Sequence, residues 1–136
     1  EQVWALVSDV TRIGEISPEC YSAEWTLGHG PAVGNRFHGY NRTATFEWDE
    51  ECEVTAVEPE RLFAFAIPPD YELANQWRYT IEPNASGCSV TESFDIPLLA
   101  RPDIYTMKIE GRCERLQGGL EITLARLKAV LEAEHG

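Results

Sequence analysis

The stretch DIYTMKIEGRCERLQGGLEITLARLKAVLEAEHG, residues 103–136, decides the fold. Its apolar residues recur at steps of three and four, which predicts one long amphipathic helix. The apolar stripe consists of Ile109, Cys113, Leu116, Leu120, Leu124, Leu127 and Leu131. Asp103 can cap the first free N–H groups. The pair Gly118–Gly119 interrupts the helix, since each Gly costs about 1 kcal/mol relative to Ala. The pair marks either a tolerated weak point or a place where the helix bends or another backbone approaches.

Six strand-like segments precede this helix and supply a broad surface on which it can lie. We expect strands at 20–27, 35–43, 46–57, 62–67, 75–82 and 88–96. Short turns rich in Gly, Pro and Asn join them, which indicates an antiparallel meander. Helix, strands and long helix in this order predict an α+β domain with the helices on one face of the sheet. A curved sheet that grips one helix leaves a hollow between them.

Two segments have a clear division between an apolar and a polar face. In 46–57, strict alternation puts Trp48, Cys52, Val54 and Ala56 on one face, together with the carboxylate of Glu50. Residues 2–11 carry an apolar stripe and are predicted to be helical, and the glycine at position 14 either ends this helix or begins a second short one.

Length, charge and cysteine spacing limit the class of protein. A chain of 136 residues is expected to form one domain over 1–136. Its net charge of −12 argues against nucleic acid and against anionic membrane surfaces as partners. No run of apolar residues is long enough for a membrane span, and no secretory signal is visible. Cys20, Cys52, Cys88 and Cys113 stand far apart, which predicts free thiols in the reducing cytoplasm, with no metal and no cofactor.

Two carboxylates lie on faces that are otherwise apolar. Glu50 and Glu92 either have raised pKa values suited to general acid–base work, or pair with an arginine or a backbone donor. The aromatic side chains of the strands are typical of a plain core. Trp77 and Tyr79, however, also bring polar tips, as in a small-molecule site. His38 lies on the opposite face of its strand and is expected to face solvent.

Several motifs resemble one known family. They are residues 3–9 (VWALVSD), 17–20 (SPEC), 34–42 (GNRFHGYNR), 77–79 (WRY) and 90–94 (VTESF). Together they resemble the polyketide cyclase/dehydrase group of the START-related (SRPBCC) superfamily. The resemblance implies a helix-grip fold, in which a seven-stranded antiparallel sheet wraps a long C-terminal helix around an internal cavity. The family begins with a strand before the first helix. Here we expect that strand either upstream of residue 1 or absent, which leaves six.

The resemblance also implies where a ligand would lie. The expected cavity residues are Phe37, Asn41, Trp48, Phe63, Phe65, Trp77, Tyr79, Glu92 and Phe94 from the sheet, with Met107, Cys113 and Leu116 from the helix. If the protein is an enzyme, Glu92 is the expected acid or base. Tyr79 and Asn41 would then orient a carbonyl or an enolate.

Three functions remain open from the sequence. The first is binding of a small apolar or aromatic molecule between sheet and C-terminal helix, with or without a cyclase-like reaction. The second is a carrier of a lipid or quinone without chemistry. The third is a protein-interaction module whose cavity is closed by its own side chains. The large inward aromatics favour a small or closed cavity, and both a monomer and a homodimer remain open.

Overall fold

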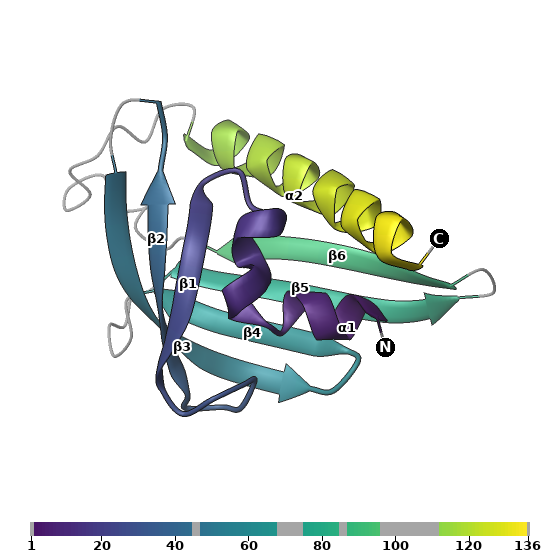
Figure 1. Cartoon of the computed structure of the whole chain (residues 1–136), viewed down its shortest axis with the longest axis horizontal. Helices are drawn as coiled ribbons and strands as arrows, with labels where there is room; N and C mark the ends of the chain where they lie inside the picture. The colour runs from purple at the N-terminus through teal and green to yellow at the C-terminus, as the bar shows by residue number, and fades with distance from the viewer. Residues whose placement is uncertain (1, 45–46, 68–74, 85–86, 96–111, 136) are drawn as a thin grey trace.

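The structure is a computed structural model that describes residues 2–44, 47–67, 75–84, 87–95 and 112–135 (Figure 1). The elements are α1 (Gln2–Val7), the 3₁₀ helix η1 (Val10–Glu15), β1 (Cys20–Leu27), β2 (Arg36–Arg42), β3 (Glu47–Glu58), β4 (Leu62–Ile67), β5 (Asn75–Asn84), β6 (Gly87–Asp95) and α2 (Arg112–His135). The strands form one antiparallel six-stranded sheet in chain order. The expected α+β helix-grip architecture is confirmed, and of the one or two short N-terminal helices expected the structure has two.

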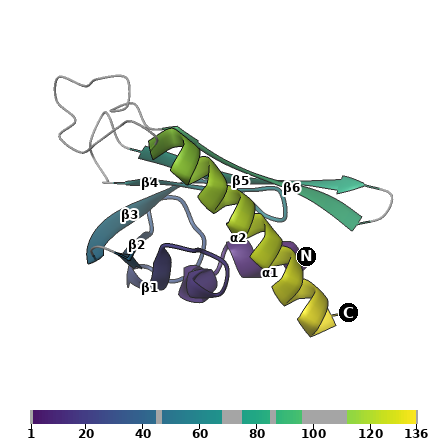
Figure 2. The same ribbon diagram turned by 90° about the horizontal axis from the view of Figure 1, so that it is seen from above.

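The helices gather on one side of the sheet. Figure 2 shows β1, β2 and β3 bending away from the plane of β4, β5 and β6, toward the side on which α1 and η1 lie. The long helix α2 crosses the same side and ends near the N-terminus (Figure 1). The sheet therefore has a concave inner face lined by the inward residues of each strand, and an outer face open to solvent.

A bulge changes the predicted faces of β3. Cross-strand pairing runs from Val54 with Phe65 to Val57 with Phe63, and the register shifts between Val54 and Ala56. The extra residue reverses the alternation, so Val57 rather than Ala56 packs against the core with Val54. The alternation expected as far as Ala56 is therefore wrong at its last step, because local periodicity does not report a bulge.

The N-terminal helical segment also breaks earlier than predicted. The α-helix ends at Val7, and Asp9 adopts an extended conformation with φ −98° and ψ 95°. Its carboxylate accepts hydrogen bonds from the backbone N–H of Thr11 at 3.0 Å and from the Thr11 hydroxyl. Asp9 therefore acts as the N-cap of η1, and the single predicted helix over 2–11 is instead two short ones.

The apolar stripe of α2 faces the core over its described length. Leu120 and Leu127 are buried, and Ile122, which lies outside the predicted stripe, is exposed. Val130 also lies outside the predicted stripe and is partly buried against the core. The helix runs without a break through Gly118 and Gly119. A Cβ at Gly119 would touch Pro18 at an ordinary 3.7 Å, and one at Gly118 would meet nothing within 4 Å. Among the described residues, no backbone atom outside the helix lies within 4 Å of either Cβ position. The predicted start at Asp103 lies outside the described residues.

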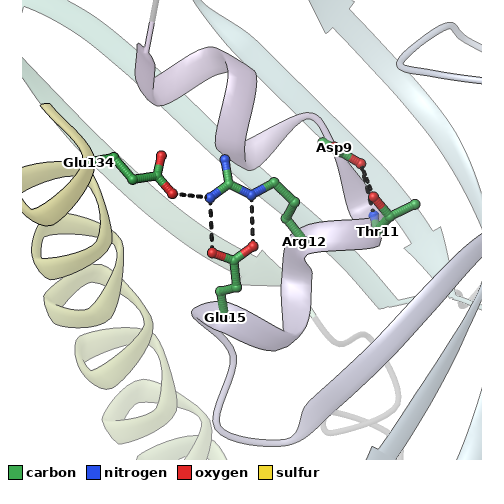
Figure 3. Close-up of polar contacts among 5 residues, drawn as sticks. All are labelled: Asp9, Thr11, Arg12, Glu15 and Glu134. Carbon is green, nitrogen blue, oxygen red and sulfur yellow. Dashed lines mark hydrogen bonds and ion pairs between the residues drawn. The ribbon is translucent and has the colours of Figure 1, made fainter.

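Polar contacts fix α2 against η1 and against the loop between η1 and β1. Arg12 forms a forked ion pair with Glu15, at 2.7 and 2.9 Å, and also bonds Glu134 near the end of α2 (Figure 3). Arg126 donates to the backbone carbonyl of Ser17 at 3.1 Å. The side chains of the ion pairs are roughly a third exposed, and such pairs contribute only about 0–1 kcal/mol each. They orient the helix, whose attachment depends mainly on its buried apolar face.

Candidate functional site

A cavity of about 150 Å³ lies on the concave face of the sheet. Residues of η1, of the loop after it and of strands β1 to β5 line it. They are Ile13, Ser17, Glu19, Cys20, Phe37, Gly39, Asn41, Trp48, Glu50, Cys52, Phe65, Ile67, Asn75, Trp77 and Tyr79. The loop that borders the cavity at Ser17 also receives Arg126 of α2.

Aromatic rings form a continuous wall of the cavity. Phe37 and Phe65 meet edge to face with ring centroids 5.2 Å apart. Trp77 pairs with Phe65 across the strands and packs against Phe94 with centroids 5.5 Å apart. Packed aromatic pairs of this kind contribute about 0.5–1.5 kcal/mol beyond the area that they bury. Trp48 completes the lining from β3, so the cavity has an aromatic wall drawn from four strands.

Two thiols open on the same cavity and are held neutral. Burial raises the pKa of Cys20 to about 11. Burial, with a smaller effect of the Glu50 carboxylate, raises the pKa of Cys52 still further above its usual range. A thiol reacts as a nucleophile through its thiolate, so these two behave as small apolar groups at neutral pH. They enlarge the apolar surface of the site and do not supply a nucleophile.

A buried acid pair stands at the β5–β6 side of the cavity. Tyr79 and Glu92 face each other across the two strands. Burial raises the pKa of Glu92 to about 7, and a hydrogen bond from Tyr79 offsets part of this rise. Burial and the neighbouring carboxylate together raise the pKa of Tyr79 well above its usual range. Of this pair, Tyr79 lines the cavity and Glu92 does not.

Two buried polar atoms of this region lack a hydrogen-bond partner within the described part of the chain. They are Nε1 of Trp77 and Oε2 of Glu92. Because Oε2 is unpaired, Oε1 is the oxygen that accepts from Tyr79. Leaving a buried donor or acceptor unpaired costs about 1–3 kcal/mol. Both atoms are shielded from water, so this cost is part of the packing of β5 against β6.

The structure places the predicted site residues in three groups. Those that line the cavity are Phe37, Asn41, Trp48, Phe65, Trp77 and Tyr79. Phe63, Glu92 and Phe94 lie next to lining residues: Phe63 is in the core at 1% exposure against Phe65, and Phe94 packs behind Trp77. Met107 lies outside the described residues, as do the side chains of Cys113 and Leu116. Asn41 on β2 is separated from Glu92 on β6 by three strands.

Several lining residues were not among the predicted site residues. Glu50, opposite Gly39, and Cys52, opposite Phe37, belong to the same inward set. Their alternation with Trp48 was the available signal, and for Glu50 it had left both acid–base work and simple pairing open, with pairing favoured. Cys20 was treated only as a thiol, although its strand position opposite Asn41 brings it to the cavity.

The outer face of the sheet carries a separate charged group. Nε2 of His38 lies 2.6 Å from Oδ2 of Asp49, and Nδ1 lies 3.5 Å from Glu51. The hydrogen bond to Asp49 is the main cause of a raised pKa for His38. His38 therefore points outward, away from the cavity. Within the described ranges, no cluster of three His, Cys, Asp or Glu side chains is arranged to hold a metal ion.

Comparison with known proteins identifies the family. The family model described as polyketide cyclase/dehydrase and lipid transport matches residues 1–132. The chain belongs to this polyketide cyclase/dehydrase and lipid transport family. The sequence resemblance to the SRPBCC polyketide cyclase/dehydrase group is thereby confirmed. No curated protein matches the chain.

Solved structures agree with this family assignment. A polyketide-cyclase-like protein from Corynebacterium glutamicum is 34% identical, with a TM-score of 0.64, covering 98% of this chain and 86% of that one. A protein from Mesorhizobium loti is 19% identical, with a TM-score of 0.69, covering 98% and 88%. A protein from Nitrosomonas europaea is 12% identical, with a TM-score of 0.71, covering 98% and 86%. The last two similarities show a shared fold.

Family membership supports a ligand-binding fold for this polyketide cyclase/dehydrase-type chain. No helix in the described ranges is long and apolar enough to cross a membrane.

Proposed function

We propose that the protein binds one small apolar or aromatic molecule in the cavity on the concave face of its sheet. The supporting observation is an aromatic-walled space of about 150 Å³ that also presents a few polar groups. An apolar cavity of about 150 Å³ in another protein binds benzene. This volume suits a molecule with one ring better than a sterol or a two-chain lipid, which argues against the lipid carrier.

A cavity-filling substitution tests this proposal. Gly39 lines the cavity, and a Cβ there would meet only the sulfur of Cys20, at 3.5 Å. We expect toluene to bind the wild-type protein saturably, in an NMR titration, and to bind Gly39→Val at least about tenfold more weakly. Ser93→Val is the matched control, because Ser93 is an exposed position of β6. Toluene binding that is absent from the wild type, or undiminished in Gly39→Val, would overturn the proposal.

A second candidate function, acid–base catalysis on the bound molecule, is supported by the acid pair. Glu92 has a pKa of about 7, and Tyr79 stands between it and the cavity. In this role Tyr79 would give its proton to a carbonyl oxygen of the substrate, and protonated Glu92 would return a proton to Tyr79. The substrate oxygen gains one proton and Glu92 loses one. Asn41 would orient the same oxygen from across the cavity.

Native mass spectrometry of the protein purified from its host tests this second candidate by identifying the retained molecule. We expect Glu92→Gln to abolish turnover of that molecule and to leave its affinity unchanged, because glutamine keeps the size of the side chain but cannot transfer the proton. Turnover that survives in Glu92→Gln would exclude the acid–base role and leave binding as the function.

We propose further that the chain acts as one domain and works in the reducing cytoplasm. The family match over residues 1–132 supports a single domain. The free thiols support a reducing compartment, since Cys20, Cys52 and Cys88 all lack a disulfide partner in the described residues.

A further inference from the structure

Glu50 is a charged group inside the cavity, and the strand beside it leaves room in front of the carboxylate. Its side chain is half-buried on the concave face of β3 and lines the cavity. The residue opposite Glu50 on β2 is Gly39, which contributes no side chain to cover the carboxylate. Among the described residues, a Cβ at Gly39 would meet only the sulfur of Cys20, at 3.5 Å. The end of a bound molecule therefore has space beside Glu50.

The negative charge of Glu50 acts on other groups of the cavity wall. Burial is the main cause of the raised pKa values of Cys20 and Cys52, and the Glu50 carboxylate adds to both. These two thiols belong to β1 and β3 and line the same space. A charge that disfavours a thiolate at two places in the cavity also disfavours an anionic ligand there and favours a cationic one.

The described residues that line the cavity include a second carboxylate and no cationic side chain. The second carboxylate is that of Glu19, in the loop before β1, and this lining contains no Lys, Arg or His. Arg126 of α2 bonds the backbone carbonyl of Ser17, which is a lining residue. Arg126 itself is exposed and does not line the cavity. The charge of the described lining is therefore negative.

We propose that the cavity selects a ligand whose apolar or aromatic body carries a protonated amine, and that the carboxylate of Glu50 accepts a hydrogen bond from this group. This inference rests on the proposed binding function and adds the chemical class of the ligand. A carboxylate offers about four lone-pair sites, so Glu50 can accept from a ligand in addition to its contacts within the protein. A hydrogen bond between ionised groups is stronger than one between neutral groups, and a partly buried pair is screened less than an exposed one.

Two probes of nearly equal size isolate the charge. Benzylamine, which is protonated at neutral pH, carries NH₃⁺ where benzyl alcohol carries OH. Their dissociation constants are measured by NMR titration in the wild type, in Glu50→Gln and in Glu47→Gln. Glu47 is the matched control, because it is exposed on β3 and alternates with the cavity residue Trp48. Both variants change the net charge equally, so any general attraction of an acidic protein for a cation changes equally in both.

We expect the wild type to bind benzylamine at least about tenfold more tightly than benzyl alcohol, as one hydrogen bond to a charged group predicts. Glu50→Gln should lose this preference, because glutamine keeps the size of the side chain and removes its charge. Glu47→Gln should keep the preference. In the wild type, intermolecular NOEs should connect the benzylic protons of benzylamine with the side chain of Glu50, a readout that does not need the variant to fold.

The possible failures are distinguishable. If toluene binds but the wild type does not prefer benzylamine, or if Glu50→Gln keeps the preference, the inference is wrong and the proposed binding function stands. An equal loss of preference in Glu47→Gln would assign it to net charge and would also overturn the inference. If Glu50→Gln does not fold, absence of the NOEs between benzylamine and Glu50 overturns it. If neither toluene nor either probe binds the wild type, the proposed function fails and the inference falls with it.

Discussion

Replacing Glu92 by glutamine should remove much of the pH dependence of stability near neutrality. Burial raises the pKa of Glu92 from 4.5 to about 7 in the folded protein. Between these values the folded chain holds a proton that the unfolded chain has released. The free energy of unfolding therefore falls as pH rises through this window and falls no further above it. A tenfold difference in proton affinity corresponds to about 1.4 kcal/mol, so the free energy of unfolding falls by about 3 kcal/mol at most across this window.

The glutamine variant mimics the protonated carboxyl and does not titrate. We expect Glu92→Gln to match the wild type near pH 4.5 and to be more stable by up to about 3 kcal/mol near pH 8. Urea unfolding followed by tryptophan fluorescence, at several pH values, gives both free energies. An unchanged m-value shows that the unfolded states remain comparable. The same fall of stability from about pH 5 to pH 7 in both proteins would refute the reasoning.

One other group works in the same direction and needs its own control. The raised pKa of His38 gives stability that is present below its usual pKa and lost as pH rises through the raised value. Its partner Asp49 is 60% exposed, so this contribution is held below about 1 kcal/mol. His38→Gln should therefore keep most of the wild-type slope. The lowered pKa of Glu15, caused mainly by Arg12, acts only below pH 4.5, where its stabilisation is lost as pH falls.

Three further predictions follow from burial and backbone spacing. Phe63→Ala should lower the free energy of unfolding by about 3–5 kcal/mol in urea titrations, since the ring is 1% exposed and its loss leaves a cavity; a change below about 1 kcal/mol would show that Phe63 is not in the core. Gly118→Ala should stabilise α2 by about 1 kcal/mol, because the added Cβ meets no atom within 4 Å. Gly14→Ala should instead destabilise the protein, because the Cβ added at Gly14 would lie 2.3 Å from a main-chain oxygen of β1. Thermal unfolding of both variants decides this, and equal shifts would contradict it. Ellman's reagent should modify the exposed Cys88 quickly and the buried Cys52 only when the protein unfolds. Mass spectrometry of the labelled peptides gives the order of modification, and labelling of Cys52 before Cys88 would contradict the prediction.

Much of the fold could be predicted from local pattern. The stripe of α2 at Leu120 and Leu127 and the bounds of β1 and β4 depend on periodicity and turn residues near in sequence, and both appear as expected. The inward set that includes Phe37, Trp77 and Tyr79 follows from strict alternation, once one member is known to face the core. Local physics is sufficient wherever the residues that decide the conformation are neighbours in the chain.

Other features depend on residues far apart in the sequence and appear only in the tertiary structure. The bulge before Val57 arises from the register of β3 against β4. Tyr79 and Glu92 meet only because β5 pairs with β6 beneath the helices. The burial that raises the pKa of Glu92 depends on the same packing. The burial of the Trp77 N–H likewise depends on the side chains that pack around its ring, Phe94 among them. The sequence by itself determined the inward residues wherever the alternation of a strand is unbroken. The tertiary structure decided which inward groups meet and how far water is excluded from them, because cross-strand distance and burial are collective properties of the packed chain.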